Sequence, residues 1–491
     1  MSLFQTETLE RYTPEPWQLE DIDYMCDRPY SANWSEMGTY KTSTGLWLAE
    51  KVTQEVQRAE RPHVLLVTSK GGKGTFFDAV PKCLPGWSFY NLETQRAQEV
   101  ALGELWEVDP AEALEPHKFR SPIVVLTHYD VFSRKTDMRN RLLRTRWDFA
   151  LVDESHRLKN EKTTWRQFMM RIRAKYKHTM TGTGFVNNPA EMWGLLNWLD
   201  KEEWPGYWNF RETYCHEYIN NSGYREIIGI KPWMVEEFRT LRASLGPRRM
   251  MAEVHKNVKH PIEEFREVEL NMTQRRMFKE IKAYLSTLDQ AGEPLRSPNV
   301  LSQLNRLRQI CVATPKVIER GIDPTTGKPF TKIELEEPSS KLDEVMGIIE
   351  EIDPDKKIVV FSNFKDPLRL LEQRLDKKEI SYLHMEQKHS DSDRYRMWHD
   401  IFPHENHRVF MSTLSLGGES INLTPAQYLI MLDRSWSPKD MMQAIGRIYR
   451  PGQKNVPCII YIDASRTTDQ YVKTKLDTKQ GWFQEIFGED A

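Results

Sequence analysis

Three groups of residues in this chain have the types and spacing that chemistry on phosphates needs. The first is the stretch SEMGTYKTST at residues 35–44, which holds Gly38, Lys41 and Thr42. In a phosphate-binding loop the backbone amides surround the phosphates, the lysine neutralises the outer ones, and the hydroxyl residue contacts magnesium. The alternative is a polar loop that caps the following helix through Thr42 or Ser43.

This stretch departs from the pattern G-x-x-x-x-G-K-[ST] at both glycines, where Ser35 and Tyr40 stand. A bulky residue held at positive φ costs roughly 1 to 2 kcal/mol. The loop can tolerate this strain if it keeps its path, because the amides that bind phosphate are still present and Gly38 relieves the turn. The predicted nucleotide-binding residues of the loop are Gly38, Thr39, Tyr40, Lys41 and Thr42.

The second group is an acidic pair, Asp153 and Glu154, which follows an apolar run in the stretch LVDESH at residues 151–156. Two carboxylates at the tip of a strand suit nucleotide chemistry with magnesium. One can hold the metal, and the other can orient and deprotonate the attacking water. We assign these roles to Asp153 and Glu154 in that order. A lone acidic pair after a strand is usually a helix cap, and the lysine loop upstream favours the catalytic interpretation.

The third group is a pair of arginines, Arg447 and Arg450, in QAIGRIYRPGQ at residues 443–453. Their separation predicts that both side chains lie on one face of a helix. Guanidinium groups on such a face can stabilise the negative charge of a phosphoryl-transfer transition state. Taken alone, the pair is more typical of a solvated surface helix. The order of loop, acidic pair and arginines along the chain favours the catalytic role.

Short, continuous apolar runs mark the strands that must position these residues, because strands of a parallel sheet are buried on both faces. The runs form two sets, at residues 63–69, 122–129, 149–155 and 178–183, and at residues 357–363, 381–386, 408–413, 428–433 and 458–463. Helical patterns such as DPLRLLEQRLDKK lie between them. This alternation predicts an α/β fold with two lobes, each built on a doubly wound parallel sheet.

The stretch between the two sets differs in composition. It is rich in helix formers and aromatic residues, with MTQRRMFKEIKAYLSTLD as an amphipathic helix and GIDPTTGKPF as a turn. We predict a first lobe at residues 1–203, a helical insertion and linker at residues 204–340, and a second lobe with a C-terminal tail at residues 341–491. A chain of this length is expected to hold about two or three domains.

The composition is that of a globular protein and excludes several classes. Lys and Arg total 69 against 71 Asp and Glu, so a nucleic-acid site needs a local basic groove. No apolar stretch is long enough to span a bilayer, and the five cysteines show neither zinc nor disulfide spacing. The N-terminus has no features of a secretory signal. We therefore expect an intracellular protein.

Together these motifs resemble the superfamily-two helicases, and within them the Swi/Snf-type DNA translocases. The resemblance runs from about residue 12 to residue 475. EMGTYKT is similar to the family's lysine loop, VDESHRLKN to its acidic box, and MTGTGFVNNPAEMWGLLNWL to the motif that couples hydrolysis to movement. In the second half, LNRLRQICVATP, IVVFSNF and STLSLGGESINLTPAQYLIMLDRSWSPKDMMQAIGRIYRPGQ follow the family's order. Trp436, Pro438 and the Gly-Gln after the arginines favour Swi/Snf-type members, whereas Tyr40, Gly184 and Ser420 depart from the pattern.

The resemblance implies further site residues. PWQLEDIDYM is similar to the family's glutamine motif, so Gln18 is expected to contact adenine. Contacts to the nucleic-acid backbone are expected at strand tips opposite the nucleotide, namely at Ser69, Lys70, Lys73, Thr127, Asn187, Asn188, Asn363, Thr413 and Trp436. An aromatic residue buried between loops is an equally good interpretation of Trp436.

The family's fold is a pair of RecA-like lobes, and its activity implies ATP hydrolysis coupled to translocation on duplex DNA without strong sequence specificity. Mg²⁺ would be held by Thr42 and Asp153. The expected catalytic residues are Lys41, Asp153, Glu154, Arg447 and Arg450. Two alternatives stay open: a strand-separating helicase for DNA or RNA, and a non-hydrolysing nucleic-acid-binding scaffold in which Tyr40 blocks turnover.

The resemblance is to a compact member of the family, of a bacterial or phage kind. We expect a monomer in a bacterial or viral-host cytosol, without a membrane partner. Because no specificity module is recognisable in the sequence, a protein partner could direct the motor to its site.

Overall fold

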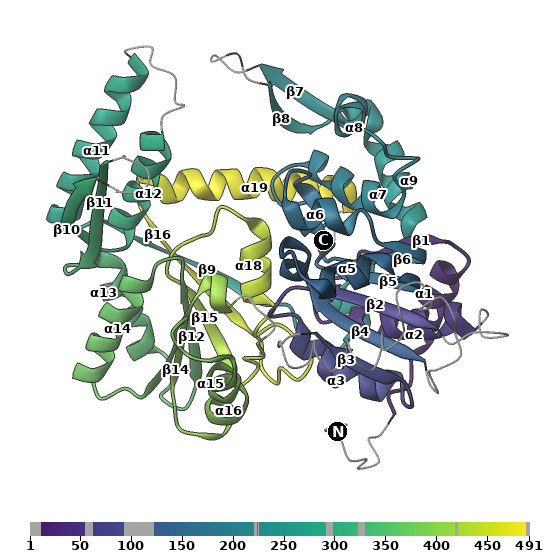
Figure 1. The fold of residues 1–491 in the computed structure, drawn as a ribbon. Helices are drawn as coiled ribbons and strands as arrows, with labels where there is room; N and C mark the ends of the chain where they lie inside the picture. Colours follow the sequence, from purple (N-terminus) through teal and green to yellow (C-terminus); the bar gives the residue numbers. More distant parts are fainter. Residues whose placement is uncertain are drawn as a thin grey trace. The chain divides into compact units, whose positions relative to one another are not determined.

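The computed structural model describes residues 11–54, 62–92, 122–219, 223, 225–290, 298–322, 329–417 and 421–487. The chain divides into two compact units, which we describe separately. Unit 1 comprises residues 1–254 and 482–491, and unit 2 comprises residues 255–481. Each unit is built around a six-stranded sheet (Figure 1). Ser420, one of the departures from the family pattern, lies outside the described residues.

The sheet of unit 1 has the strand order β1-β6-β5-β2-β4-β3, and all neighbouring strands are parallel. Its strands are β1 (Tyr30–Asn33), β2 (His63–Thr68), β3 (Ser88–Asn91), β4 (Ile123–His128), β5 (Arg146–Asp153) and β6 (Arg173–Met180). An antiparallel pair, β7 (Cys215–Ile219) and β8 (Arg225–Ile230), lies outside this sheet.

The α-helices of unit 1 are α1 (Pro16–Cys26), α2 (Lys41–Gln54), α3 (Lys73–Cys83), α5 (Asp137–Arg144), α6 (Thr164–Met169), α7 (Trp193–Leu199), α8 (Tyr207–Tyr214), α9 (Val235–Leu245) and α10 (Met251–Val254). Short 3-10 helices are η2 (Tyr129–Ser133), η3 (Ser155–Lys159), η4 (Pro189–Met192) and η5 (Pro232–Met234). Alternate residues of the central strands enter two different cores. Leu65, Val67 and Val152 pack with the residues of α7 and α9, whereas Val64, Leu66 and Leu151 pack with those of α1, α2 and α3.

The sheet of unit 2 has the order β13-β14-β12-β15-β16-β9 and is also wholly parallel. Its strands are β9 (Ile262–Val268), β12 (Lys357–Ser362), β13 (Tyr382–Met385), β14 (Val409–Thr413), β15 (Ala426–Met431) and β16 (Cys458–Ala464). A second antiparallel pair consists of β10 (Thr314–Ile322) and β11 (Pro329–Glu336), and Figure 1 shows it beside helices α11 and α12.

The helices of unit 2 are α11 (Met272–Gln290), α12 (Pro298–Val312), α13 (Ser340–Glu351), α14 (Lys365–Lys377), α15 (Asp391–Arg396), α16 (Phe402–His404), α17 (Leu414–Gly417), α18 (Pro438–Ile445) and α19 (Thr468–Phe487), with a π-helical turn at Met397–Ile401. Here too, alternate residues of a strand belong to two different cores. Ile358 and Val360 pack with residues of α13 and α14, whereas Val359 and Phe361 pack with residues of α18 and α19. None of the described helices is both long and apolar enough to cross a membrane.

The predicted fold class is confirmed, because both sheets are parallel and covered on both faces. The nine predicted strands are all present, and β1, β3 and β9 join the sheets in addition. The stretch at residues 204–340 contains helices, as predicted, but also the strands β7 to β11. The predicted segment boundaries stay a prediction.

Candidate active site

The lysine loop leads from β1 into α2, at the edge of the sheet in unit 1. Two of its residues have left-handed backbone, Gly38 with φ 80° and Tyr40 with φ 55°. The positive φ expected at Tyr40 is therefore present, together with its strain of about 1 to 2 kcal/mol. Tyr40 is 49% exposed. Its backbone carbonyl oxygen accepts a hydrogen bond from the hydroxyl of Ser43 at 2.9 Å. The loop keeps its turn because the ring does not have to fit into the core.

Lys41 is the first residue of α2, and its ammonium group turns back into the loop. Its Nζ donates to the carbonyl oxygen of Glu36 at 2.5 Å, and the hydroxyl of Thr39 donates to the same oxygen at 2.7 Å. Burial lowers the pKa of Lys41, and the carboxylates of Glu154 and Asp153 act in the opposite direction. The structure thus brings the predicted lysine and the predicted acidic pair within electrostatic reach of one another.

Gln18 on α1 is buried and packs against α2. Its amide nitrogen donates to the hydroxyl of Thr44 at 2.9 Å, and its carbonyl oxygen accepts the N–H of Glu15 at 3.0 Å. These bonds fix α1 to the helix that follows the lysine loop. The contact of Gln18 with adenine stays a prediction. Thr42 occupies the second position of α2.

The acidic pair lies where β5 ends. Asp153 accepts the hydroxyl of Thr68 at 2.8 Å on one carboxylate oxygen and the N–H of Glu154 at 2.9 Å on the other. Burial raises the pKa of Asp153, and the neighbouring charge of Glu154 raises it further. A negative charge at Asp153 is therefore costly without a nearby cation, and a divalent metal there would be stabilised.

Glu154 has a left-handed backbone, with φ 50°. Strained backbone of this kind is frequent where a side chain must be held in one direction for function. Its carboxylate lies 3.2 Å from Nδ1 of His156, and that nitrogen also lies 3.2 Å from the hydroxyl of Thr181. Thr181 belongs to the stretch that resembles the coupling motif. The imidazole of His156 therefore contacts both motifs.

Three residues that the sequence reasoning did not single out support this site: Thr68, Tyr129 and His156. The hydroxyl of Tyr129 donates to the carbonyl oxygen of Asp153. Thr68 and Tyr129 gave no signal in the sequence, because they are 85 and 24 residues from Asp153. His156 lies inside the acidic box itself, where its position beside the carboxylates was the available signal.

The nucleic-acid residues predicted in unit 1 lie mostly at the carboxyl edge of its sheet. Strands β2 and β4 end side by side, with Thr68 opposite His128. Ser69 and Lys70 follow β2, Lys73 begins α3, and Thr127 is the penultimate residue of β4. The structure therefore brings these four predicted residues to one edge. Lys70 forms an ion pair with Asp130 at 2.8 Å.

Two buried polar atoms at this edge have no hydrogen-bond partner among the described residues, Oγ1 of Thr127 and Nδ1 of His128. Burial lowers the pKa of His128 to about 4, and the charge of Lys73 adds to this shift. The imidazole of His128 is thus neutral at neutral pH. His128 was not among the predicted residues, although it directly follows Thr127.

The paired asparagines after the coupling motif use their polar groups within the loop. The side-chain amide of Asn187 donates to Glu191 at 2.9 Å, and the side-chain oxygen of Asn188 accepts the N–H of Ala190 at 3.1 Å. These bonds position the start of η4. A contact of either asparagine with nucleic acid stays a prediction.

The nucleic-acid residues predicted in unit 2 lie at or beyond the carboxyl ends of its strands. Ser362 at the end of β12 is opposite Thr413 at the end of β14, and Asn363 directly follows Ser362. The amide of Asn363 donates to Asp433 at 2.5 Å. Trp436 follows β15 and is half-buried, with its ring edge-on to Tyr471 at 6.0 Å between centroids.

The two predicted arginines converge, but not on a helix. Helix α18 ends at Ile445, and Gly446 follows as its C-cap, so the prediction of one helical face is wrong. Beyond Gly446 the chain continues in turns, as in the bond from the N–H of Arg447 to the carbonyl of Ala444 at 3.1 Å. Both guanidinium groups still donate to the carbonyl oxygen of Ile421, at 3.4 Å from Arg447 and 3.1 Å from Arg450.

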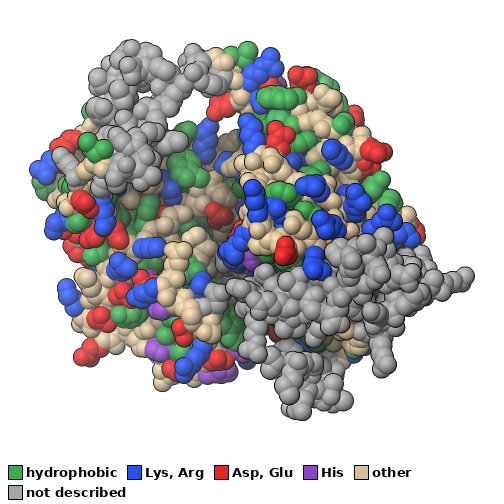
Figure 2. Space-filling model, in the orientation of Figure 1, with side chains coloured by type: hydrophobic (Ala, Val, Ile, Leu, Met, Phe, Trp, Pro, Cys, Tyr) green, Lys and Arg blue, Asp and Glu red, His purple; other side chains and the backbone are tan. Residues whose placement is uncertain are grey.

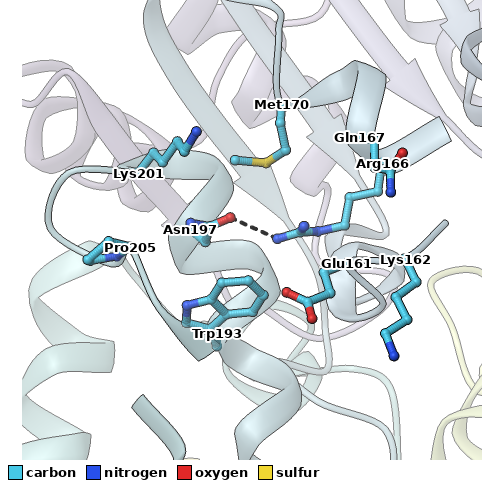
Figure 3. Close-up of a pocket in the computed structure, with 9 residues that line it drawn as sticks. All are labelled: Glu161, Lys162, Arg166, Gln167, Met170, Trp193, Asn197, Lys201 and Pro205. Atoms are coloured by element: carbon cyan, nitrogen blue, oxygen red, sulfur yellow. Dashed lines mark hydrogen bonds between the residues drawn. The ribbon is translucent and has the colours of Figure 1, made fainter. Parts of the chain in front are cut away.

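A pocket of about 480 Å³ in unit 1 lies apart from the predicted residues (Figure 3). Its lining comes from α6, α7 and adjacent segments: Glu161, Lys162, Arg166, Gln167, Met170, Trp193, Asn197, Lys201 and Pro205. Arg166 donates to Asn197 at 2.9 Å and lies over the ring of Trp193 at 4.9 Å. Next to the pocket, a Cβ at Gly194 would lie 2.3 Å from the carbonyl oxygen of Leu158. Helix α7 therefore packs directly against η3, which carries His156.

Comparisons with family models cover the acidic pair and the two arginines. The family model of the SNF2-related domain matches residues 87–315, and that of the helicase conserved C-terminal domain matches residues 340–452. Together the two matches cover more than half of the chain, and the first contains the acidic pair while the second contains the two arginines.

Relatives of known name include the ISWI chromatin-remodeling complex ATPase ISW2 of Saccharomyces cerevisiae, which is 28% identical over 67% of this chain and 29% of that protein. Protein CHROMATIN REMODELING 5 of Arabidopsis thaliana is 24% identical over 97% of this chain and 27% of that protein. Among solved structures, the Sulfolobus solfataricus SWI2/SNF2 ATPase core in complex with dsDNA is 20% identical, with a TM-score of 0.43 over 97% of this chain and 93% of that one. The chain spans about a third or less of the length of these curated relatives. On its two matched domains and the motifs that they contain, the chain belongs to the Snf2-type family of superfamily-two helicases.

Proposed function

We propose that this protein is an ATP hydrolase that moves along double-stranded DNA. The observation that carries the proposal is the meeting of Lys41, Asp153 and Glu154 at one edge of a parallel sheet, where both carboxylates act on the pKa of the lysine. A cation and two carboxylates on rigid elements match what binding and hydrolysis of a magnesium nucleotide need.

The residues present fit ATP with Mg²⁺. The hydroxyl of Thr42 and the carboxylate of Asp153 are oxygen ligands of the kind that Mg²⁺ prefers, with the nucleotide phosphates completing the shell. When bound, Mg²⁺ would neutralise charge on the phosphates and stabilise the transition state. The raised pKa of Asp153 supports this assignment, because a cation there would relieve the repulsion from Glu154.

Glu154 is the group that we assign to the attacking water. Its carboxylate would accept a hydrogen bond from the water and then its proton, while the water oxygen bonds to the γ-phosphorus and the bond to the β–γ bridging oxygen breaks, so that ADP leaves. His156, at 3.2 Å, holds the carboxylate in place. The ammonium of Lys41 would leave the carbonyl oxygen of Glu36 and neutralise the outer phosphates. The 3.2 Å contact between His156 and Thr181 offers a direct route from the acidic box to the coupling motif.

The proposal of DNA as the track is supported by the strand-tip residues and by surface charge. Backbone tracking needs hydroxyls and local positive charge rather than base readout. Ser69, Lys70, Lys73 and Thr127 gather at one edge, and Oγ1 of Thr127 has no partner among the described residues. Figure 2 shows Lys and Arg side chains gathered on the face of unit 1 that is turned to the viewer. Relatives such as ISW2 are named as chromatin-remodeling ATPases, which is consistent with a duplex substrate.

Phosphate release measured without nucleic acid, and then with duplex DNA, single-stranded DNA or RNA, tests this proposal. We expect duplex DNA to stimulate turnover most, and Lys41→Ala to abolish the stimulated rate. Displacement of a triplex-forming strand from a long duplex would report movement. Stimulation by RNA or single strands alone would favour the strand-separating helicase instead. The monomeric state, a targeting partner and a cytosolic location remain proposals from the sequence.

Tyr40→Gly tests the alternative hypothesis that the protein is a nucleic-acid-binding scaffold in which Tyr40 blocks ATP turnover. Glycine adopts φ 55° without steric strain, but it loses more entropy on folding, so we expect stability to change by less than about 1 kcal/mol. Turnover of the variant should stay within about threefold of the original, because the loop already has the conformation that glycine favours. If the original chain releases no phosphate and Tyr40→Gly restores release, the tyrosine blocks the site and the scaffold reading is correct.

A further inference from the structure

Arg308 lies near the C-terminal end of α12, at a point where that helix is firmly anchored. The side chain of Gln274 donates to the carbonyl oxygen of Ile310 at 2.6 Å. The hydroxyl of Ser339 donates to the carbonyl oxygen of Val312 at 2.5 Å. Ile310 is fully buried in the core of unit 2. The last turn of α12 is thus bonded to α11 and to the start of α13, and the backbone at Arg308 has little freedom to move.

The guanidinium group of Arg308 is buried, and it contacts the segments that follow two neighbouring strands. Its Nη2 donates to the carbonyl oxygen of Arg434 at 2.6 Å and lies 3.5 Å from the carboxylate of Asp433, both just beyond β15. Its central carbon lies 5.5 Å from the ring of Phe364, beyond β12, and 5.5 Å from the ring of Trp436. These distances are within the range of cation–π attraction.

Asp433 extends the contact of Arg308 to Asn363. One carboxylate oxygen of Asp433 accepts the hydroxyl of Ser362 at 2.6 Å and the N–H of Asn363 at 3.0 Å. The other accepts the side-chain amide of Asn363 at 2.5 Å. Asp433 is only 2% exposed, and the charge of Arg308 helps to balance its own. The same carboxylate orients the amide of Asn363.

Trp436 is held from several directions. Its ring packs edge-on against Tyr471, the guanidinium of Arg308 lies over it, and its carbonyl oxygen accepts Nζ of Lys479 at 2.7 Å. The ring is half-buried, so part of its surface stays accessible. Through Arg308, Trp436 is in contact with α12.

We propose that Arg308 is a positioning residue for nucleic-acid binding, which sets the orientation of Trp436 directly and that of Asn363 through Asp433. This inference rests on the proposed function and deepens it, since it makes α12 a determinant of how unit 2 engages duplex DNA. Arg308 belongs to unit 2, whereas the lysine loop and the acidic pair belong to unit 1. Its loss should therefore affect the affinity for DNA and leave the affinity for ATP unchanged.

A purely structural role has to be separated from positioning, because removal of Arg308 takes one cation away from the buried carboxylate of Asp433. Arg308→Met removes the charge and keeps the length of the side chain. The double variant Arg308→Met/Asp433→Asn removes both charges, so it should recover most of the lost thermal stability. Arg275→Met, on the exposed face of α11, is the matched control for loss of one arginine in unit 2.

Two measurements test the proposal. In the first, the duplex DNA concentration for half-maximal stimulation of phosphate release should rise about tenfold in Arg308→Met, the effect of one lost buried cation–π contact with its hydrogen bond. The KM for ATP should not change. The double variant should keep the raised value although its melting temperature recovers, and Arg275→Met should behave like the original chain. Recovery of DNA affinity together with stability would overturn positioning in favour of a structural role.

The second measurement needs no DNA. The protein is labelled with 5-fluorotryptophan, and the fluorine resonance of Trp436 is assigned as the one that disappears in Trp436→Phe. This resonance should shift or broaden in Arg308→Met and in the double variant, but not in Arg275→Met. An unchanged resonance in Arg308→Met would overturn the inference. If the resonance shifts but duplex DNA does not stimulate the original chain, the orientation of Trp436 by Arg308 is upheld and the proposed function fails.

Discussion

Replacing Glu154 with glutamine should lower the turnover number for ATP by about 1,000-fold, within the range that loss of a general base produces. Glutamine keeps the size of the side chain and can still orient water, but it cannot accept the proton. The charge of Glu154 also raises the pKa of Asp153. Its removal should therefore favour ionised Asp153 and leave the affinity for Mg²⁺·ATP equal or higher. Phosphate release with saturating duplex DNA and binding of a fluorescent ATP analogue would measure the two effects.

Glu161→Gln is the matched control, because it makes the same chemical change at an exposed carboxylate in the segment that follows η3. It should not alter turnover. A decrease of less than tenfold in Glu154→Gln would mean that another group activates the water, whereas a large loss of nucleotide affinity would mean that Glu154 acts in binding.

Arg447→Lys should lower turnover by about 100-fold to 1,000-fold, the usual effect of losing one preorganised donor to a transition state. Lysine keeps the positive charge but not the planar fork of donors that matches phosphate oxygens. Arg447 is 4% exposed, so its guanidinium is held in place rather than mobile in solvent. The KM for ATP should change little, because a group that acts in the transition state contributes little to ground-state binding.

Arg396→Lys, at an exposed position on α15, is the control for an arginine-to-lysine change elsewhere in unit 2. The melting temperature of each variant should be compared, since Arg447 is buried. A raised KM with normal turnover would assign Arg447 to nucleotide binding. Normal values of both would leave Arg450, which donates to the same carbonyl oxygen of Ile421, as the candidate for the transition-state role.

The strands that could be predicted from the sequence are those that lie between two cores. HVLLVT and KIVVFS are continuous apolar runs because both of their faces are covered. The strand IEEFREV escaped prediction, since it lies at the edge of its sheet and carries charged residues at most positions. YSAN and SFYN escaped because four residues give too little pattern.

The candidate site was predictable in its residue types and their order, but not in its contacts. The lysine and the acidic pair follow from local motifs, and the strand-tip hydroxyls follow from the resemblance to the family. The partner of Asn363 is Asp433, which is 70 residues away, and no local pattern indicates such a pair. The arginine spacing predicted a helical face, whereas helix α18 ends at Ile445 with Gly446 as its C-cap, and the chain continues in turns. The two guanidinium groups do converge, on the carbonyl oxygen of Ile421, but through turns of the chain rather than through a shared helical face.

The loop that follows β2 packs closely against the hydroxyl of Thr68, beside the carboxylate of Asp153. A Cβ at Gly72 would lie 2.3 Å from the hydroxyl oxygen of Thr68 and 3.4 Å from the carboxylate of Asp153, and Thr68 donates to that same carboxylate. Ser69 and Lys70, in the same loop, belong to the proposed DNA edge. A displacement of this loop by a DNA phosphate would thus reach the proposed magnesium ligand through the hydroxyl of Thr68. One side chain would then couple DNA binding to ATP hydrolysis.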